Sequence, residues 1–216
     1  MHILFLDTAS AEPSLLLSTE EKILVRKMLP KQGESHITRY LEEALKEVGW
    51  RYEDLTHIAC IAGPGGFVSV RVGITMANVL SHFLGTSLAG VHLSELWEAR
   101  VSSPYSLPVG EGFYWLHSTR RTQLFIRNLC PSGRSACHPQ SDILKYSEPV
   151  LIDLEEAATL EGAYVGELIE EHRKALPGCT PVSPSSIKAL EEVLPSFLSK
   201  LSYKQEQLLP WYGREA

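Results

Sequence analysis

Three short apolar runs open the chain, and only a few polar residues separate each run from the next. Residues 2–7 (HILFLD), 14–19 (SLLLST) and 23–29 (ILVRKML) are each long enough for one strand. A polar turn at 20–22 joins the second run to the third. Because short turns connect neighbouring antiparallel strands, the pattern predicts a three-stranded antiparallel meander.

An amphipathic helix is predicted after the meander. Ser35 suits its N-cap and Gly49 suits its end. Between them, apolar residues recur at intervals of three and four, which places them on one helical stripe: Ile37, Tyr40, Leu41, Ala44, Leu45 and Val48. A short buried strand is then predicted at 57–62 (HIACIA), and it leads directly into the sequence Gly-Pro-Gly-Gly at 63–66.

The segment 67–84 follows this glycine-rich turn. Its first half alternates like a strand, but a turn of this kind after a strand commonly begins a helix, so we expect a helix from near Ser69. Gly73, Ala77 and Ser81 lie four residues apart on one side of that helix. Small residues at this spacing allow another helix to approach closely, or they pack against the chain's own sheet. Both interpretations stay open at this point.

The second half of the chain begins after a segment rich in Ser, Pro and Gly at 101–112, which predicts a linker. We therefore expect an N-terminal lobe at 1–102 and a smaller C-terminal lobe at 103–216. An aromatic, extended tail is predicted at 209–214. The remaining elements expected of the second lobe are strands at 113–117, 123–129 and 149–153 and helices at 154–161, 164–175 and 185–201.

Charge and residue spacing argue against several classes of function. A net charge of −6 disfavours an electrostatic grip on nucleic acid. The four cysteines form no Cys-x-x-Cys pair, no two histidines lie four apart, and no Gly-x-Ser-x-Gly motif occurs, so metal sites and an activated serine lack support. Without a run of about 18 continuous apolar residues, no membrane helix is expected. The chain is expected to be soluble and cytoplasmic.

Two short motifs are candidate binding elements. Asp7-Thr8 follows the first strand, where a carboxylate can reach a metal or water and a hydroxyl can face phosphate. A fuller form of this motif has a glycine between the two residues, and an ordinary turn is the alternative. The second motif, Gly63-Pro64-Gly65-Gly66-Phe67, lacks the Lys-Ser/Thr of a P-loop, so a structural turn with a left-handed Gly65 is expected. Arg71 is expected to pair locally or with a carboxylate of a partner.

Four stretches together resemble the TsaB (YeaZ) family, whose members are bacterial subunits in threonylcarbamoyladenosine synthesis on tRNA. They are MHILFLDTAS at the start, His36, GPGGFVSVRVGITMANVL at 63–80, and PWYGR near the end. The family's second motif reads Gly-Pro-Gly-Ser-Phe-Thr-Gly-hydrophobic-Arg-hydrophobic-Gly. Gly66, Val68 and Ser69 depart from it. The family's Asp-Ala-Arg is replaced here by Ser-Thr-Arg at 118–120.

The resemblance implies an α/β fold of two actin- and Hsp70-like lobes, of the ASKHA and ribonuclease H-like type, each a mixed sheet flanked by helices. It implies a non-catalytic scaffold subunit without metal or other cofactor. Such a subunit binds the catalytic subunit TsaD, helps to recruit the ATPase TsaE, and meets tRNA only through the complex.

In the family, helices of the first lobe form the dimer interface. The positions of this chain that match them are His36, Tyr40, Glu43, Arg71, Gly73, Ile74, Ala77, Asn78 and Ser81. Self-pairing through the same helices is plausible as well, because a two-fold interface uses one patch twice. Two alternatives remain: an enzyme of the superfamily, either a kinase or a glycoprotease-like peptidase, and a homodimer that acts outside tRNA modification.

Overall fold

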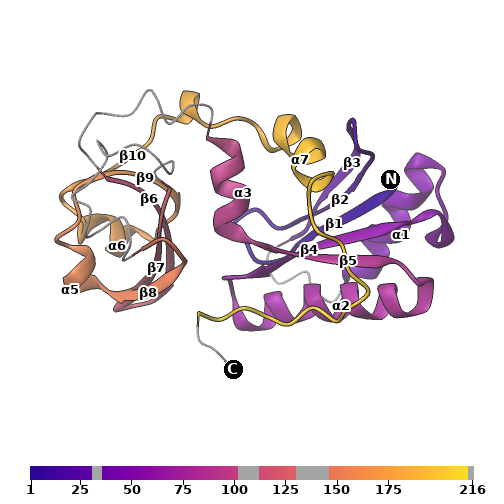
Figure 1. The fold of residues 1–216 in the computed structure, drawn as a ribbon, viewed down its shortest axis with the longest axis horizontal. Coiled ribbons are helices and arrows are strands. Elements are labelled where there is room, and N and C mark those ends of the chain that lie inside the picture. The colour runs from indigo at the N-terminus through magenta and orange to yellow at the C-terminus, as the bar shows by residue number, and fades with distance from the viewer. Residues whose placement is uncertain (31–35, 102–111, 130–145, 214–216) are drawn as a thin grey trace. The chain divides into compact units, whose positions relative to one another are not determined.

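A computed structural model describes residues 1–30, 36–101, 112–129 and 146–213 (Figure 1). The chain forms two compact units. Unit 1 consists of Met1–Leu93 and Ala189–Tyr212, and unit 2 consists of Ser94–Lys188 together with the last residues from Gly213. This division differs from the predicted lobes at 1–102 and 103–216. The difference arises because the end of the chain returns to unit 1, where helix α7 (Leu190–Leu198) packs against its sheet.

Unit 1 is built on a five-stranded mixed sheet in the order β3-β2-β1-β4-β5. The first three strands pair antiparallel, as the apolar runs predict, while β1, β4 and β5 are parallel. The strands are β1 (Ile3–Asp7), β2 (Ser14–Ser18), β3 (Ile23–Met28), β4 (His57–Gly63) and β5 (Ser87–His92).

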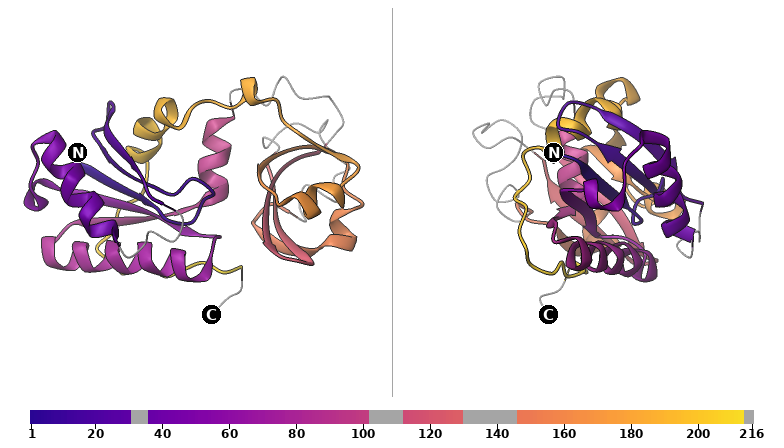
Figure 2. Two further views of the ribbon diagram at one scale, coloured as in Figure 1. Left: turned by 180° about the vertical axis from the view of Figure 1, so that it is seen from behind. Right: turned by 90° about the vertical axis from the view of Figure 1, so that its right-hand side faces the viewer.

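Two helices, α1 (Ile37–Val48) and α2 (Phe67–Leu84), cover one face of this sheet. Figures 1 and 2 show α7 on the opposite side of the sheet from α2. Gly49 ends α1 with a φ of 73°, as predicted, whereas Ser35 lies outside the described residues. Helix α2 begins at Phe67 rather than near Ser69, because the chain turns into the helix directly after Gly66.

Unit 2 repeats the strand arrangement of unit 1. Its sheet has the order β8-β7-β6-β9-β10, with an antiparallel set of three strands followed by two parallel additions. Its strands are β6 (Gly112–Arg120), β7 (Gln123–Asn128), β8 (Val150–Asp153), β9 (Gly162–Glu167) and β10 (Cys179–Pro181). Helices α5 (Leu154–Ala157) and α6 (Glu170–Lys174) flank it, and α3 (Leu93–Arg100) leads into the unit. Two mixed sheets flanked by helices confirm the predicted fold class.

Several predicted elements of the second half are wrong in type or extent. The helix expected at 164–175 is replaced by strand β9 and the short helix α6. Strand β9 forms because it pairs in parallel with β6 and β10, and at its start Gly162 lets the Gly112 backbone lie where a side chain would be. The helix expected at 185–201 starts later, after a 3-10 turn at Pro184–Ser186. Strand β5 and helix α3 were not predicted, and the linker lies mostly in 102–111, outside the described residues.

Candidate functional site

Asp7, the first candidate binding residue, is buried at the end of β1. Its Oδ1 atom accepts hydrogen bonds from the backbone N–H groups of Ala9 and Ser10, each at 3.0 Å. Burial raises the pKa of the Asp7 carboxyl, although the hydrogen bonds from Ser10 and Ala9 oppose that rise. The carboxylate therefore caps the turn that follows β1.

Thr8 is buried beside the first turn of α2. Its Oγ1 donates a 2.7 Å hydrogen bond to the carbonyl of Ser69. Gly73 faces it so closely that a Cβ on Gly73 would lie 2.5 Å from the same Oγ1. The carboxylate and the hydroxyl that a phosphate site would need are thus engaged within the protein, which favours the ordinary-turn interpretation of Asp7-Thr8.

The glycine-rich loop at 63–66 packs against two other segments. Gly63 has a φ of 142°, and the Trp211 carbonyl lies where a Gly63 side chain would be. A Cβ on Gly65 would lie 2.7 Å from Cβ of Ala9, but Gly65 has no positive φ, so the prediction of a left-handed Gly65 is wrong. Close approach to Ala9 is what requires a glycine there. The predicted structural role of the loop agrees with this packing.

The predicted interface residues of α2 divide into buried and surface positions. Gly73, Ile74 and Ala77 are buried in unit 1, so this part of the small-residue ridge packs on the chain's own sheet. Asn78 and Ser81 make internal hydrogen bonds: the Asn78 side chain with Leu208, and the Ser81 hydroxyl with the Thr86 carbonyl. Of the α2 residues predicted for the interface, Arg71 alone is exposed.

The outer side of α2 carries large apolar side chains, and we call it the docking face. The exposed fractions are 56% for Phe67, 66% for Val68, 49% for Val79 and 80% for Phe83, with Arg71 and Thr75 exposed among them. By length and composition alone α2 could cross a membrane, but its inner side is packed on the sheet. Sequence reasoning missed these exposed residues, although the apolar character of α2 on all sides was a signal for them.

The predicted interface residues of α1 lie at its surface. His36 and Glu43 are exposed and Tyr40 is half-buried. Glu43 accepts a 2.9 Å hydrogen bond from Nε of Arg39, one helical turn earlier. The described structure thus leaves these three positions accessible, but it assigns no partner to them.

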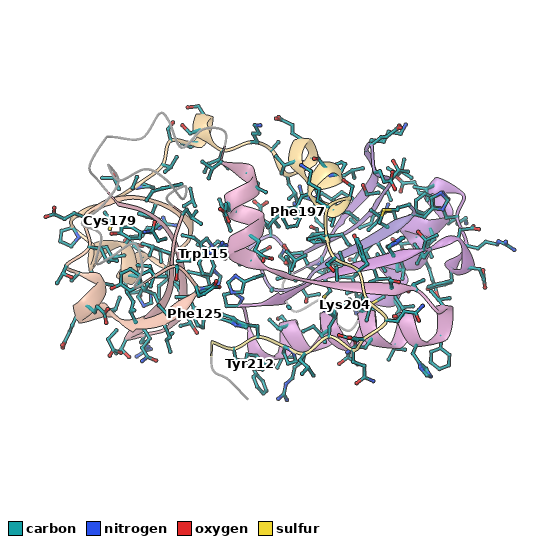
Figure 3. All side chains as sticks on the ribbon, viewed as in Figure 1. Trp115, Phe125, Cys179, Phe197, Lys204 and Tyr212 are labelled. Carbon is teal, nitrogen blue, oxygen red and sulfur yellow. The ribbon has the colours of Figure 1, made fainter. Side chains whose placement is uncertain are left out.

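The C-terminal tail, residues 203–212, runs in an extended conformation along unit 1, and Figure 3 labels Lys204 and Tyr212 in it. Lys204 and Leu88 exchange two backbone hydrogen bonds of 2.7 and 2.8 Å. The Asn78 side chain makes two hydrogen bonds to the backbone of Leu208. It donates to the Leu208 carbonyl at 3.0 Å and accepts from the Leu208 N–H at 2.9 Å. Trp211 N–H donates to the Ala62 carbonyl at 2.8 Å. The tail therefore borders α2 as far as the glycine-rich loop.

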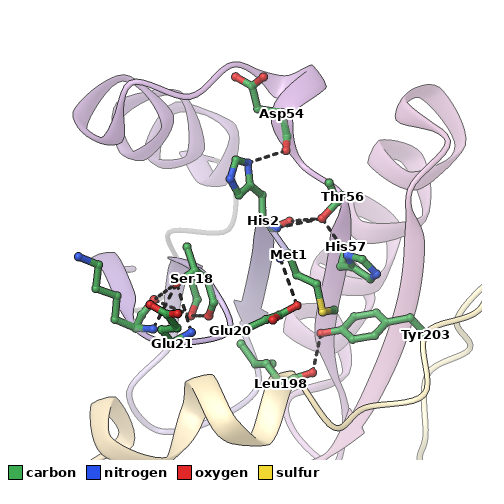
Figure 4. A network of polar contacts seen from close by, with 12 residues as sticks. Met1, His2, Ser18, Glu20, Glu21, Asp54, Thr56, His57, Leu198 and Tyr203 are labelled. Atoms are coloured by element: carbon green, nitrogen blue, oxygen red, sulfur yellow. Dashed lines mark hydrogen bonds and ion pairs between the residues drawn. The ribbon is translucent and has the colours of Figure 1, made fainter.

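A polar network ties the N-terminal strand to the start of this tail (Figure 4). His2 Nδ1 lies 3.0 Å from the Asp54 carbonyl, and the Thr56 hydroxyl lies 2.8 Å from His57 Nδ1. The His57 ring meets Tyr203 edge-on at 4.7 Å, and the Tyr203 hydroxyl donates to the Leu198 carbonyl. Every contact here joins neighbouring elements of unit 1, so the network has a structural role. Within the described ranges, no group of three His, Cys, Asp or Glu residues could hold a metal ion.

A serine–histidine pair lies in unit 2. The Ser118 hydroxyl is 2.9 Å from Nδ1 of buried His172, and it also accepts a hydrogen bond from the Ile169 N–H. His172 Nε2 lies 3.2 Å from the Arg121 carbonyl, which can only accept, so Nε2 carries the proton and Nδ1 accepts from Ser118. A serine that donates to a histidine nitrogen is also the arrangement of an activated nucleophile. Here, however, His172 is completely buried and the Ser118 oxygen accepts from the Ile169 N–H, so the pair ties β6 to the start of α6.

Comparisons with known proteins support the sequence resemblance. A family model described as TsaD, tRNA N6-adenosine threonylcarbamoyltransferase, matches residues 28–127. A curated tRNA N6-adenosine threonylcarbamoyltransferase from Geobacillus thermodenitrificans is 27% identical over 110 residues, which represent 43% of this chain and 32% of that protein. The chain therefore spans well under half the length of the curated relative that it matches.

Solved structures match along the whole chain. One, from Pseudomonas aeruginosa, is described as an uncharacterized protein with similarity to peptidase YeaZ; it has a TM-score of 0.68, 18% identity and 99% coverage of both chains. YeaZ from Pseudomonas aeruginosa has a TM-score of 0.67 and 18% identity, with 98% of this chain and 99% of that chain covered. The predicted resemblance to TsaB (YeaZ) proteins is thus confirmed in the fold.

Proposed function

We propose that this chain is a TsaB-type scaffold subunit in threonylcarbamoyladenosine synthesis on tRNA, and that it binds a TsaD-type catalytic subunit through the docking face of α2. The observation that carries this proposal is the exposure of Phe67, Val68, Val79 and Phe83 along one helix. The match to the TsaD family model and the YeaZ-like fold support the pathway.

The docking face has the properties of a protein interface. Large apolar side chains that gather on one exposed helix side are uncommon on a protein without a partner. Burying them removes apolar surface from water, at about 25 cal/mol for each Å². The inner side of α2 is rigidly packed, with Val70 and Ala77 fully buried, so the outer side is presented on a fixed support.

A scaffold role also fits the polar residues of unit 1. Asp7 and Thr8 are the residues that an enzyme of this superfamily would aim at phosphate, and here they cap a turn and hold α2. The superfamily-enzyme alternative predicts ATP turnover by the isolated chain that Asp7→Ala abolishes. The scaffold proposal predicts no such turnover, a cytoplasmic location, and tRNA contact only through the complex. Recruitment of a TsaE-type ATPase is part of the same proposal.

Light scattering coupled to size-exclusion chromatography tests the docking face. The chain would be measured alone and with the TsaD-type subunit of the same organism, as wild type and as Val79→Arg. Met28→Arg is the matched control, because Met28 on β3 is also 49% exposed. We expect a heterodimer with wild type and Met28→Arg, and weaker association with Val79→Arg, since an interface core excludes an unpaired charge.

Three results would count against the proposal. Equal loss with both arginine variants would mean that the docking face is not specific. A complex that tolerates Val79→Arg would place the interface elsewhere. Self-association without any heterodimer would favour the homodimer alternative. Ala77 was also predicted for the interface, but Ala77→Arg cannot serve as a test of it. Ala77 is completely buried, so the variant would disrupt the core.

A further inference from the structure

The end of the C-terminal tail meets the start of the docking face in a cluster of three side chains. The rings of Phe67 and Tyr212 stack with centroids 5.4 Å apart and planes 27° apart. The guanidinium carbon of Arg71 lies 3.8 Å from the centre of the Phe67 ring. Arg71 Nε donates a 3.2 Å hydrogen bond to the Tyr212 hydroxyl. We call this cluster the aromatic–arginine anchor.

Two contacts fix the guanidinium of Arg71 and leave part of it available. Its face rests on Phe67 and its Nε is engaged by Tyr212. Arginine has five N–H donors in a planar fork, so four of them, on the two terminal nitrogens, are not used by these contacts. Arg26, Arg39, Arg51 and Arg127 form ion pairs with carboxylates of the described residues, whereas Arg71 pairs with none of those carboxylates.

The sequence of α2 indicates which anion would occupy this fork. Arg71 is the only arginine in α2, which has no lysine, and the chain has a net charge of −6. A nucleic-acid backbone would require several cations along its path. A single oriented guanidinium beside exposed apolar side chains is instead typical of a protein interface, where arginine and aromatic residues carry much of the binding energy. The planar fork fits a carboxylate with two parallel hydrogen bonds.

We infer that the aromatic–arginine anchor receives a carboxylate side chain of the partner protein, and that the tail residue Tyr212 is a positioning residue of the interface. This inference rests on the proposed function, because it names the chemistry of one end of the docking face. The inference extends the docking face to the C-terminal tail, which lies more than 100 residues after α2 in the sequence. The tail is held beside α2 by the hydrogen bonds between Asn78 and Leu208 and by the one from the Trp211 N–H to the Ala62 carbonyl. These bonds keep Tyr212 in place next to Arg71.

The test is the dissociation constant for the TsaD-type subunit, measured by isothermal titration with the full chain and four variants. Arg71→Ala is expected to weaken binding roughly 10- to 100-fold, as removal of an interface hot spot does. Arg71→Lys keeps the charge but loses the fork and the stack, and is expected to weaken binding at least about fivefold. Tyr212→Phe keeps the stack on Phe67 and removes only the hydrogen bond to Arg71, so a loss of about threefold to tenfold is expected. Arg51→Ala, which removes a side chain that is 78% exposed, is the matched control and should bind like wild type.

The salt dependence of binding and the melting temperature distinguish loss of the carboxylate contact from loss of folded structure. The difference between wild type and Arg71→Ala should shrink when salt rises from about 0.1 M to about 1 M, because exposed charge pairs are screened. Melting temperatures of Arg71→Lys and Tyr212→Phe should stay close to that of wild type.

Each contrary outcome has its own meaning. If wild type binds but Arg71→Ala and Tyr212→Phe bind within about twofold of it, the anchor is overturned and the proposed function stands. If wild type forms no complex, the proposed function and the anchor both fail. If Arg71→Ala instead removes tRNA binding by the isolated chain and leaves the protein complex unchanged, the fork holds phosphate and the inference is wrong.

Discussion

Gly73 lies in the middle of α2, and replacing it by alanine tests how tightly the helix sits on the sheet. Alanine favours a helix interior over glycine by about 1 kcal/mol, so a free-standing helix would gain stability from the change. In this protein the new Cβ would lie 2.5 Å from Oγ1 of Thr8 and 3.3 Å from Sγ of Cys60. Overpacking of a buried site costs about 1–3 kcal/mol. We therefore expect Gly73→Ala to lower the free energy of unfolding by about 1 kcal/mol.

The assay is urea unfolding of wild type, Gly73→Ala, Thr8→Ala and the double variant. Thr8→Ala removes the colliding hydroxyl together with its hydrogen bond to Ser69, so it is destabilising alone but should partly relieve Gly73→Ala. The expected coupling energy is about 1 kcal/mol. Thr75→Ala, on the exposed side of α2, is the control and should be neutral or slightly stabilising. A more stable Gly73→Ala, or no coupling to Thr8, would refute the packing described here.

Three further predictions concern Asp7, His117 and Asn78. Asp7→Asn keeps an Oδ1 acceptor for the turn and removes a buried carboxylate whose pKa is raised. At pH 7 this variant should therefore unfold at an equal or higher urea concentration than wild type, and the difference should be smaller at pH 4. Asp7→Ala removes the acceptor, so its free energy of unfolding should fall by about 1–3 kcal/mol. Burial lowers the pKa of His117 to about 4, and this outweighs the Glu167 carboxylate 3.9 Å away. Stability should therefore fall by up to about 3 kcal/mol as pH drops from 6.5 toward 4, and urea titrations of His117→Phe should show a flatter profile. Asn78→Ala should speed amide hydrogen exchange at Leu208 by at least about tenfold. Unchanged exchange would show that the hydrogen bonds from Asn78 do not hold the tail in place.

The first half of the fold was predictable because its signals are local. The apolar runs of β1, β2 and β3 alternate with short polar turns, and Gly49 ends α1 with the left-handed backbone expected of it. The strand, glycine-rich turn and helix at 57–84 also formed in the predicted order. In these segments each residue's preference and its tertiary environment agree.

The features that sequence reasoning missed depend on distant contacts. The spacing of Gly73, Ala77 and Ser81 shows one helix side, but only the partners Thr8 and Cys60 decide that this side faces the sheet. Tyr164, Val165, Leu168 and Ile169 recur at helical spacing, yet pairing with β6 and β10 makes the first part of the segment 164–175 a strand. The sequence predicts an extended tail, yet no pattern in the neighbouring residues indicates that the Asn78 side chain hydrogen-bonds Leu208.

The docking face is the central claim, and site-specific photo-crosslinking tests it most directly. A photoreactive phenylalanine analogue would replace Phe83, which is 80% exposed on α2, and in a second protein Met28 on β3. Each would be irradiated with the TsaD-type subunit. We predict a crosslink to that subunit from position 83 and none from position 28. A crosslink from position 28 alone, or from position 83 only to a second copy of this chain, would contradict the proposed docking.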